Sequence, residues 1–290
     1  MQLRQSTLEK EGIRMQKNNQ TVLIAKSLND VFYHINTVNN LQILGGCTRV
    51  NTINEISLTV ASIPELLTID KKERHIDFGP AVTLSQILEI GRNKMPSVLY
   101  DAIETVATPA VRNIATLGGN ICASCSADGD ESAQKLTLYA PLLALDARLE
   151  FKNQNETMYV PFNKFTSIPH GFVLTKIRVP FDDWEVAIFR RVGPSNIITP
   201  LSAGFVFLAD TQKDILANIR IAFAGTILFR SLELENRVIG TRLPLSKRTI
   251  DSLIQEAEEQ YINTVENHDK FPILKAQFLN LLRYSLEQLT

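Results

Sequence analysis

Residues 108–121 read Thr108-Pro109-Ala110-Val111-Arg112-Asn113-Ile114-Ala115-Thr116-Leu117-Gly118-Gly119-Asn120-Ile121, and they interrupt a regular alternation of strand and helix patterns. Small and polar residues continue from there to Asp130, and no helical period runs through the stretch. In a chain otherwise rich in leucine and isoleucine, so many small residues indicate that something approaches the backbone closely. We therefore interpret Thr116 to Asn120 as a glycine turn with two free backbone amides.

A second glycine turn, Leu44-Gly45-Gly46-Cys47-Thr48, directly follows an apolar segment at 41–44 that is typical of a strand. Backbone amides at such a place can meet a phosphate. A lone Gly-Gly pair is more often a plain tight turn, because glycine is the usual turn residue. Thr116 and Asn120 add polar side chains at the other turn, so from the residues alone phosphate binding and a plain turn are equally supported there. Neither turn matches the dinucleotide fingerprint or the P-loop, which argues against a Rossmann or NTPase assignment.

Composition limits the function classes. The chain has 290 residues, 44% hydrophobic and 21% charged, which suggests two globular units. A formal net charge of -1 predicts no attraction to nucleic acid. No apolar run is long enough for a membrane span, and the polar N-terminus carries no apolar leader, so we expect a cytoplasmic protein.

The patterns predict an α+β fold divided near Pro180. We expect an N-terminal extension at 1–20, a first domain at 21–181 and a second at 185–290. The first domain carries strand patterns at 22–25, 41–44, 75–79, 148–151 and 174–179, and helix patterns at 27–38, from Thr83 or Ser85 to 92, at 98–106 and at 132–143. The second carries strand patterns at 185–190, 203–209 and 218–224, followed by helix patterns at 233–239, 249–262 and 272–289. This order predicts a three-stranded antiparallel sheet backed by helices.

Residues that could carry chemistry are few. Cys122 and Cys125 have the spacing of a redox pair, but Cys47 and the scattered histidines cannot complete a four-ligand metal site, so we predict no metal. We favour buried or pocket-lining thiols over a dithiol redox function. The acidic loop with Asp128 and Asp130 fits either a solvated turn or a carboxylate that accepts from sugar hydroxyls.

Residues 108–121 resemble, nearly position for position, the signature S-P-x-I-R-N-x-A-T-I-G-G-N-L of the FAD-binding (medium) subunits of molybdenum hydroxylases. These are the flavoprotein subunits of bacterial xanthine dehydrogenases and aerobic carbon monoxide dehydrogenases. Shorter matches lie at 63–66, 82–84 and 189–193, and the resemblance covers 21–289. It implies a two-part FAD-binding domain of the PCMH (vanillyl-alcohol-oxidase-like) type, followed by a C-terminal α+β domain.

The resemblance also implies which residues bind FAD. The first pyrophosphate loop would comprise Ile43, Leu44, Gly45, Gly46, Cys47, Thr48, Arg49 and Val50, and the second Thr116, Leu117, Gly118, Gly119 and Asn120. Asp128 or Asp130 would supply a carboxylate, Leu174 an apolar flavin contact, and Arg190 would stand where the family has a lysine. The chain departs from the family at Cys47, which replaces a glycine, and at Arg49, which replaces an acidic residue.

By resemblance, electrons would come from a molybdopterin-containing large subunit through a small subunit with two [2Fe–2S] clusters. FAD in this chain would pass them to NAD⁺ or another acceptor, and no side chain would act as a catalytic acid or base. Three alternatives stay open: a stand-alone flavoprotein oxidoreductase, a flavin-free scaffold of such a complex, and a dithiol redox protein.

Overall fold

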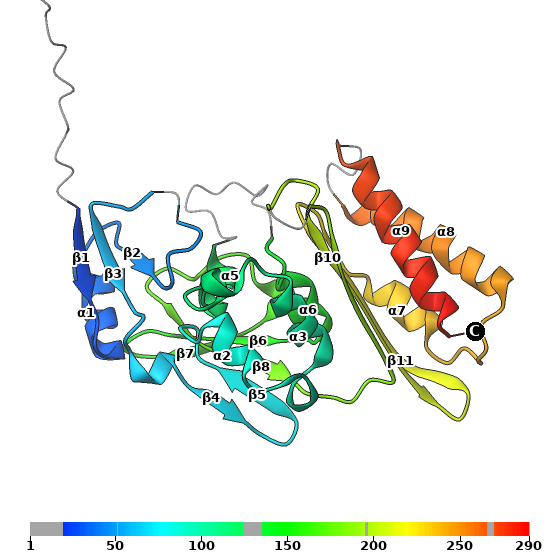
Figure 1. The fold of residues 1–290 in the computed structure, drawn as a ribbon, viewed down its shortest axis with the longest axis horizontal. Helices are drawn as coiled ribbons and strands as arrows, with labels where there is room; N and C mark the ends of the chain where they lie inside the picture. The colour runs from blue at the N-terminus through cyan, green and yellow to red at the C-terminus, as the bar shows by residue number, and fades with distance from the viewer. Residues whose placement is uncertain (1–19, 51, 124–134, 195–196, 266–269, 290) are drawn as a thin grey trace, which may run out of the picture.

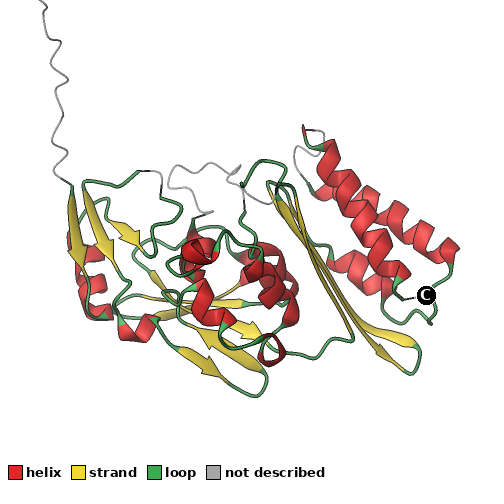
Figure 2. Ribbon diagram, viewed as in Figure 1, coloured by secondary structure: helices red, strands yellow, loops and turns green. Residues whose placement is uncertain are grey.

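The computed structural model describes residues 20–50, 52–123, 135–194, 197–265 and 270–289. Three sheets follow one another along the molecule, and three helices close its C-terminal end (Figures 1 and 2). This arrangement is the α+β class that the sequence predicts. Among the described helices, none combines the length and apolar composition needed to cross a bilayer.

The first sheet is parallel and three-stranded, in the order β1 (Thr21–Ile24), β3 (Ile56–Thr59), β2 (Gln42–Leu44). Helix α1 (Leu28–Thr37) begins where expected, because Ser27 and Asp30 form a reciprocal capping box. Val31 of this helix and Leu58 of the central strand are fully buried in a small separate core. Strand β2 ends at the first glycine turn, so the sheet presents that turn at its edge.

The second sheet is five-stranded and antiparallel. Its strands, in order across the sheet, are β4 (Ile69–Lys71), β5 (His75–Phe78), β8 (Val173–Pro180), β6 (Arg148–Lys152) and β7 (Thr157–Pro161). Short helices pack on one face: α2 (Leu84–Leu88), α3 (Ser97–Glu104), α4 (Pro109–Arg112), α5 (Leu117–Cys122) and α6 (Tyr139–Ala144). Three single-turn 3₁₀ helices complete this part at Pro64–Leu66, Arg92–Lys94 and Phe162–Lys164.

The third sheet contains β9 (Val186–Val192), β10 (Ala203–Gln212) and β11 (Ile215–Gly225), extended at one edge by the two-residue strand β12 (Leu228–Phe229). Side chains alternate between two cores, as the pleat requires. Val206 and Leu208 pack toward α3 and α6, whereas Phe205 and Phe207 face α7 (Leu232–Val238), α8 (Lys247–Thr264) and α9 (Pro272–Glu287). Helices therefore cover both faces of this sheet, and it joins the two halves of the molecule.

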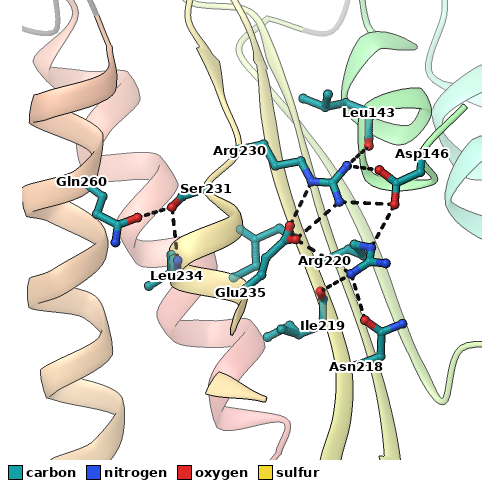
Figure 3. A network of polar contacts seen from close by, with 11 residues as sticks. Leu143, Asp146, Asn218, Ile219, Arg220, Arg230, Ser231, Leu234, Glu235 and Gln260 are labelled. Carbon is teal, nitrogen blue, oxygen red and sulfur yellow. Dashed lines mark hydrogen bonds and ion pairs between the residues drawn. The ribbon is translucent and has the colours of Figure 1, made fainter. Parts of the chain in front are cut away.

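An ion-pair network around the buried Arg230 and Glu235 side chains ties the third sheet to the segment that ends α6 (Figure 3). Arg230, whose side chain is 6% exposed, donates to the carbonyl oxygen of Leu143 and to Asp146, both at 2.5 Å. It also bonds Glu235 of α7 at 3.0 Å, and that carboxylate accepts the Ile221 amide of β11 at 2.9 Å. The network fixes how the C-terminal unit sits on the preceding domain.

Most predicted elements are present, but the prediction of a glycine turn within residues 108–121 was wrong. Thr116 and the glycines form no isolated turn; they are the N-cap and the first turn of α5, within which Leu117 and Ile121 are buried. The lack of a long helical period hid two helices that are too short to show one. The helix predicted from 83 or 85 to 92 ends earlier, at Leu88, before Gly91 with its φ of 90°. Part of the helix predicted at 132–143 lies outside the described residues, and its described part begins at Tyr139.

Candidate functional site

The two glycine segments touch each other. A Cβ placed on Gly46 would lie 1.7 Å from the carbonyl oxygen of Ile114, and one on Gly45 would lie 2.9 Å from the Thr116 Oγ1. No side chain fits at position 46 unless the backbone of one segment moves. The glycines are therefore required because two loops far apart in the sequence press together, rather than because of a turn conformation.

The amides of the second segment are not free, contrary to the expectation from sequence. Gly118 N–H donates to the Pro80 carbonyl at 2.9 Å, and Gly119 N–H donates to the Thr116 Oγ1 at 3.0 Å. The amides of the first segment, by contrast, are free. Among the described residues, the backbone N–H groups of 45–49 have no hydrogen-bond acceptor. Free amides for an anion thus lie on the Gly45 loop, which Thr116 supports from the other side.

Two cavities lie on either side of this contact, and Thr116 and Gly119 line both. The larger, about 400 Å³, is also lined by Thr48, Arg49 and Asn120. The smaller, about 100 Å³, is more apolar, and its walls include Ile43, Gly45, Leu66, Gly118, Phe172 and Leu174. The site therefore consists of two neighbouring compartments that share walls at Thr116 and Gly119.

Asn120 lines the larger cavity and carries an unsatisfied side-chain acceptor. Its Oδ1 is buried and has no donor among the described residues. A buried acceptor without a partner costs about 1–3 kcal/mol, so such atoms in native proteins need an explanation. A ligand that donates a hydrogen bond in this cavity would supply one.

Arginine side chains hold the opposite wall of the larger cavity. Arg191 donates to the carbonyl oxygens of Thr105 at 2.5 Å and Pro194 at 3.2 Å, and has no carboxylate partner among the described residues. Burial lowers the pKa of its guanidinium. Arg112 donates to three more carbonyls in the segment 104–107. Both arginines thus fix the backbone of this wall, and Arg191 adds an uncompensated positive charge to it.

The structure brings many of the predicted site residues together. Those that line a cavity are Ile43, Gly45, Thr48, Arg49, Thr116, Gly118, Gly119, Asn120 and Leu174. Those that line neither are Leu44, Gly46, Cys47, Val50, Leu117 and Arg190. Among these, Leu44 and Leu117 are buried in the core and Cys47 is exposed. Asp128 and Asp130 lie outside the described residues.

Arg191 is the residue that sequence reasoning missed. Arg190 and Arg191 follow each other on strand β9, so their side chains point to opposite faces of the sheet. Arg190 is exposed, and its guanidinium donates to the Phe189 carbonyl. The strand's alternation was readable from the sequence, but only the packing of β9 against the helices shows which arginine faces the cavity.

The cysteines and metal ligands give no second site. Cys122 borders the smaller cavity, whereas Cys125 lies outside the described residues, so the dithiol alternative stays untested. Within the described ranges, no group of His, Cys, Asp and Glu side chains is arranged to hold a metal ion.

Comparison with known proteins gives consistent matches. Residues 16–182 match the FAD binding domain in molybdopterin dehydrogenase. The xanthine dehydrogenase FAD-binding subunit of Escherichia coli O157:H7 is 29% identical over 160 residues, which is 52% of this chain and 44% of that protein. The chain thus spans under half the length of this relative.

Solved structures share the fold. A chain of the Cu,Mo-CO dehydrogenase superposes with a TM-score of 0.76 at 17% identity, over 93% of this chain and 97% of its own. A chain of quinoline 2-oxidoreductase from Pseudomonas putida 86 superposes with a TM-score of 0.73 at 16% identity, over 93% of this chain and 95% of its own. At these identities the likeness shows that the chains share a fold.

Proposed function

Since the chain belongs to the family of FAD binding domains in molybdopterin dehydrogenase, we propose that it binds FAD in the cavities beside its two glycine loops and serves as the electron-transfer flavoprotein subunit of a molybdenum hydroxylase complex. The observation that carries this proposal is the contact of Gly45 and Gly46 with Ile114 and Thr116, beside which the first loop, with no acceptor for its 45–49 amides among the described residues, contributes Gly45, Thr48 and Arg49 to the two cavities.

The residues present fit FAD. A pyrophosphate requires donors and positive charge, and the free amides of the first loop together with the Arg49 side chain offer both. FAD has a ring system at each end, and there is one compartment on each side of the loop contact. Asn120 Oδ1 would accept from a donor group of the cofactor. The replacement of an acidic residue by Arg49 adds attraction for a phosphate.

When bound, FAD supplies the exchange of one or two electrons, and this chain binds and orients it. We further propose that a molybdopterin-containing subunit and a [2Fe–2S] subunit deliver the electrons, that NAD⁺ or another acceptor removes them, and that the complex is cytoplasmic. Family membership and the name of the E. coli relative support a subunit role in a molybdopterin-containing complex, whereas the acceptor and the location rest on the sequence alone.

Titration of the purified full chain with FAD and, separately, with FMN tests the central proposal. FMN lacks the pyrophosphate and the adenosine, so it leaves one compartment empty. We expect FAD to bind at least tenfold more tightly than FMN, read from flavin fluorescence and from absorbance of the bound form. A colourless chain whose melting temperature FAD does not change would refute FAD binding.

A flavin-free scaffold is the second candidate, because Cys47 and Arg49 depart from the family in the loop that carries the free amides. Restoring the family residues with Cys47→Gly and Arg49→Asp distinguishes the two. If FAD binding needs this restoration, the natural chain is a scaffold. If the wild-type chain binds and Arg49→Asp weakens binding, Arg49 is part of the phosphate site.

A further inference from the structure

The five-stranded sheet has an outer face, opposite its helices, that carries charged side chains in register. Arg148 of β6 lies directly opposite Arg178 of β8, and Glu150 lies opposite Lys176. Like charges in directly opposed cross-strand positions destabilise a sheet. Two arginines at such a position need an anion to balance their charge. Among the described residues, a carboxylate does so for only one of the two guanidinium groups.

Arg178 is the guanidinium whose charge is balanced. Its Nε and Nη2 donate to the two oxygens of Asp77, each at 2.8 Å, and the Asp77 side chain is 6% exposed. Burial raises the pKa of this carboxyl, but the Arg178 hydrogen bonds and charge and the Lys176 charge outweigh burial and hold the pKa below its usual value. Arg148, in contrast, is exposed and has no carboxylate partner among the described residues.

The second carboxylate of this face is also fully engaged. Glu150, 7% exposed in its side chain, accepts from Thr175 Oγ1 at 2.8 Å and pairs with Lys152 at 3.1 Å and Lys176 at 3.8 Å. Around Arg148 the face thus presents four cationic side chains above two buried carboxylates: Arg148, Lys152, Lys176 and Arg178 over Asp77 and Glu150. A third carboxylate, Asp70, lies opposite Asp77 and is paired with Lys72 at 2.9 Å, so it leaves this balance unchanged. It keeps a net positive charge in a chain whose formal net charge is -1.

A hollow of about 310 Å³ lies at the centre of this face, lined by Arg148, Glu150, Tyr159, Lys176 and Arg178. Tyr159 of β7 is 66% exposed, which leaves an aromatic ring at the rim without a core to pack on. Arginine and tyrosine are enriched at protein interfaces and dominate their binding energy. The hollow shares no lining residue with either cavity of the glycine loops.

We propose that this hollow docks an acidic segment of a partner protein, with one carboxylate seated between Arg148 and Arg178 and an apolar side chain against Tyr159. A carboxylate there would balance the Arg148 charge and remove the cross-strand repulsion. Because Glu150 lies in the floor, a compact dianion such as free phosphate would be repelled at the centre. A single side-chain carboxylate between the two arginines carries one negative charge, so Glu150 repels it less than it repels a dianion.

Binding of a fluorescent peptide of alternating glutamate and leucine to the full chain tests the proposal. We expect Arg148→Glu to weaken binding at least tenfold and Tyr159→Ala at least threefold, and added salt to weaken it further because the charges are exposed. Arg248→Glu, which changes an exposed arginine of α8 by the same charge, is the matched control and should have no effect. Carbodiimide coupling of the peptide should map to Lys152 or Lys176.

Each result decides the proposal. Equal weakening by Arg148→Glu and Arg248→Glu would show general charge attraction and overturn it. So would coupling sites elsewhere on the chain, or tighter Arg148-dependent binding of inorganic phosphate or of phosphatidylserine vesicles than of the peptide. Circular dichroism and melting of Arg148→Glu establish that the sheet is intact; because the arginine is exposed and unpaired, we expect no loss of stability. None of these outcomes depends on FAD binding.

Discussion

Replacement of Asn120 by alanine should have opposite effects on the free and the FAD-bound protein. In the free chain the Asn120 Oδ1 is a buried acceptor without a donor. Such an atom costs about 1–3 kcal/mol, and its removal offsets the packing lost with the side chain. We therefore expect Asn120→Ala to leave the free energy of unfolding unchanged or to raise it by about 1 kcal/mol.

In the bound protein the same substitution removes a hydrogen bond to the cofactor. A bond of this kind contributes about 0.5–1.5 kcal/mol, which corresponds to an affinity loss of about 2- to 10-fold. At an FAD concentration 100 times the wild-type Kd, bound cofactor stabilises the wild type by about 2.7 kcal/mol. A tenfold weaker variant would keep only about 1.4 kcal/mol of this at the same concentration.

Thermal unfolding with and without FAD measures both effects, and calorimetric titration gives the Kd directly. One kcal/mol shifts the melting temperature of a chain of this size by about 2–4 °C, so the loss of FAD stabilisation is measurable. Asn113→Ala is the matched control, because Asn113 Oδ1 is already satisfied by Ser85 at 2.6 Å and lines neither cavity. If Asn120→Ala destabilises the free chain and leaves the FAD Kd unchanged, Asn120 is structural and our reasoning is refuted.

Three further predictions concern the loop contact, the network between the domains and the outer sheet face. For Gly46→Ala, the Cβ 1.7 Å from a carbonyl oxygen must force the loops apart, so we expect a stability loss of about 1–3 kcal/mol in urea and more than tenfold weaker FAD binding by titration. For Arg230→Gln, the 1%-exposed Glu235 loses its main partner, and urea unfolding should show a loss of about 3–5 kcal/mol. The pKa of Asp77 is lowered in the folded state. Its contribution to the free energy of unfolding is therefore present above the ordinary pKa of about 3.8 and is lost as pH falls through the folded value. Asp77→Asn should remove this part of the acid unfolding, which circular dichroism follows.

Matched variants separate these effects from general damage. Gly240→Ala forces a non-glycine residue to a φ of 85°, but the added Cβ would have no other atom within 4 Å. The substitution should therefore lower the free energy of unfolding by about 1–2 kcal/mol through backbone strain alone, without changing FAD affinity. Arg283→Gln breaks an exposed ion pair with Asp251 and should cost at most about 1 kcal/mol. Normal FAD binding by Gly46→Ala, or equal losses for Arg230→Gln and Arg283→Gln, would contradict the corresponding arguments.

Sequence reasoning worked where the signal was local. Ser27 as an N-cap placed the start of α1, and the apolar face of the last helix placed α9, because such patterns depend on residues only a few positions apart. The stretch 108–121 identified the family from its residues alone. Strands β3, β4 and β7 were not predicted, although predicted strands such as β2 are equally short.

The same stretch shows what lay beyond the sequence. Its composition indicated a close approach, yet the approaching atoms belong to Pro80, Gly45 and Gly46 of the protein itself, and the free amides belong to the Gly45 loop rather than to 116–120. The assignment of the cavity to Arg191 rather than Arg190, and the pairing of Arg148 with Arg178, likewise depend on packing and strand register.

The sequence by itself determined the class, the family and the two glycine segments, since capping, periodicity and a contiguous signature are properties of neighbouring residues. Only the tertiary structure decided which amides stay free, which arginine enters the site and which charges meet across the sheet. Those outcomes depend on contacts between segments far apart in the chain, and no local pattern encodes them.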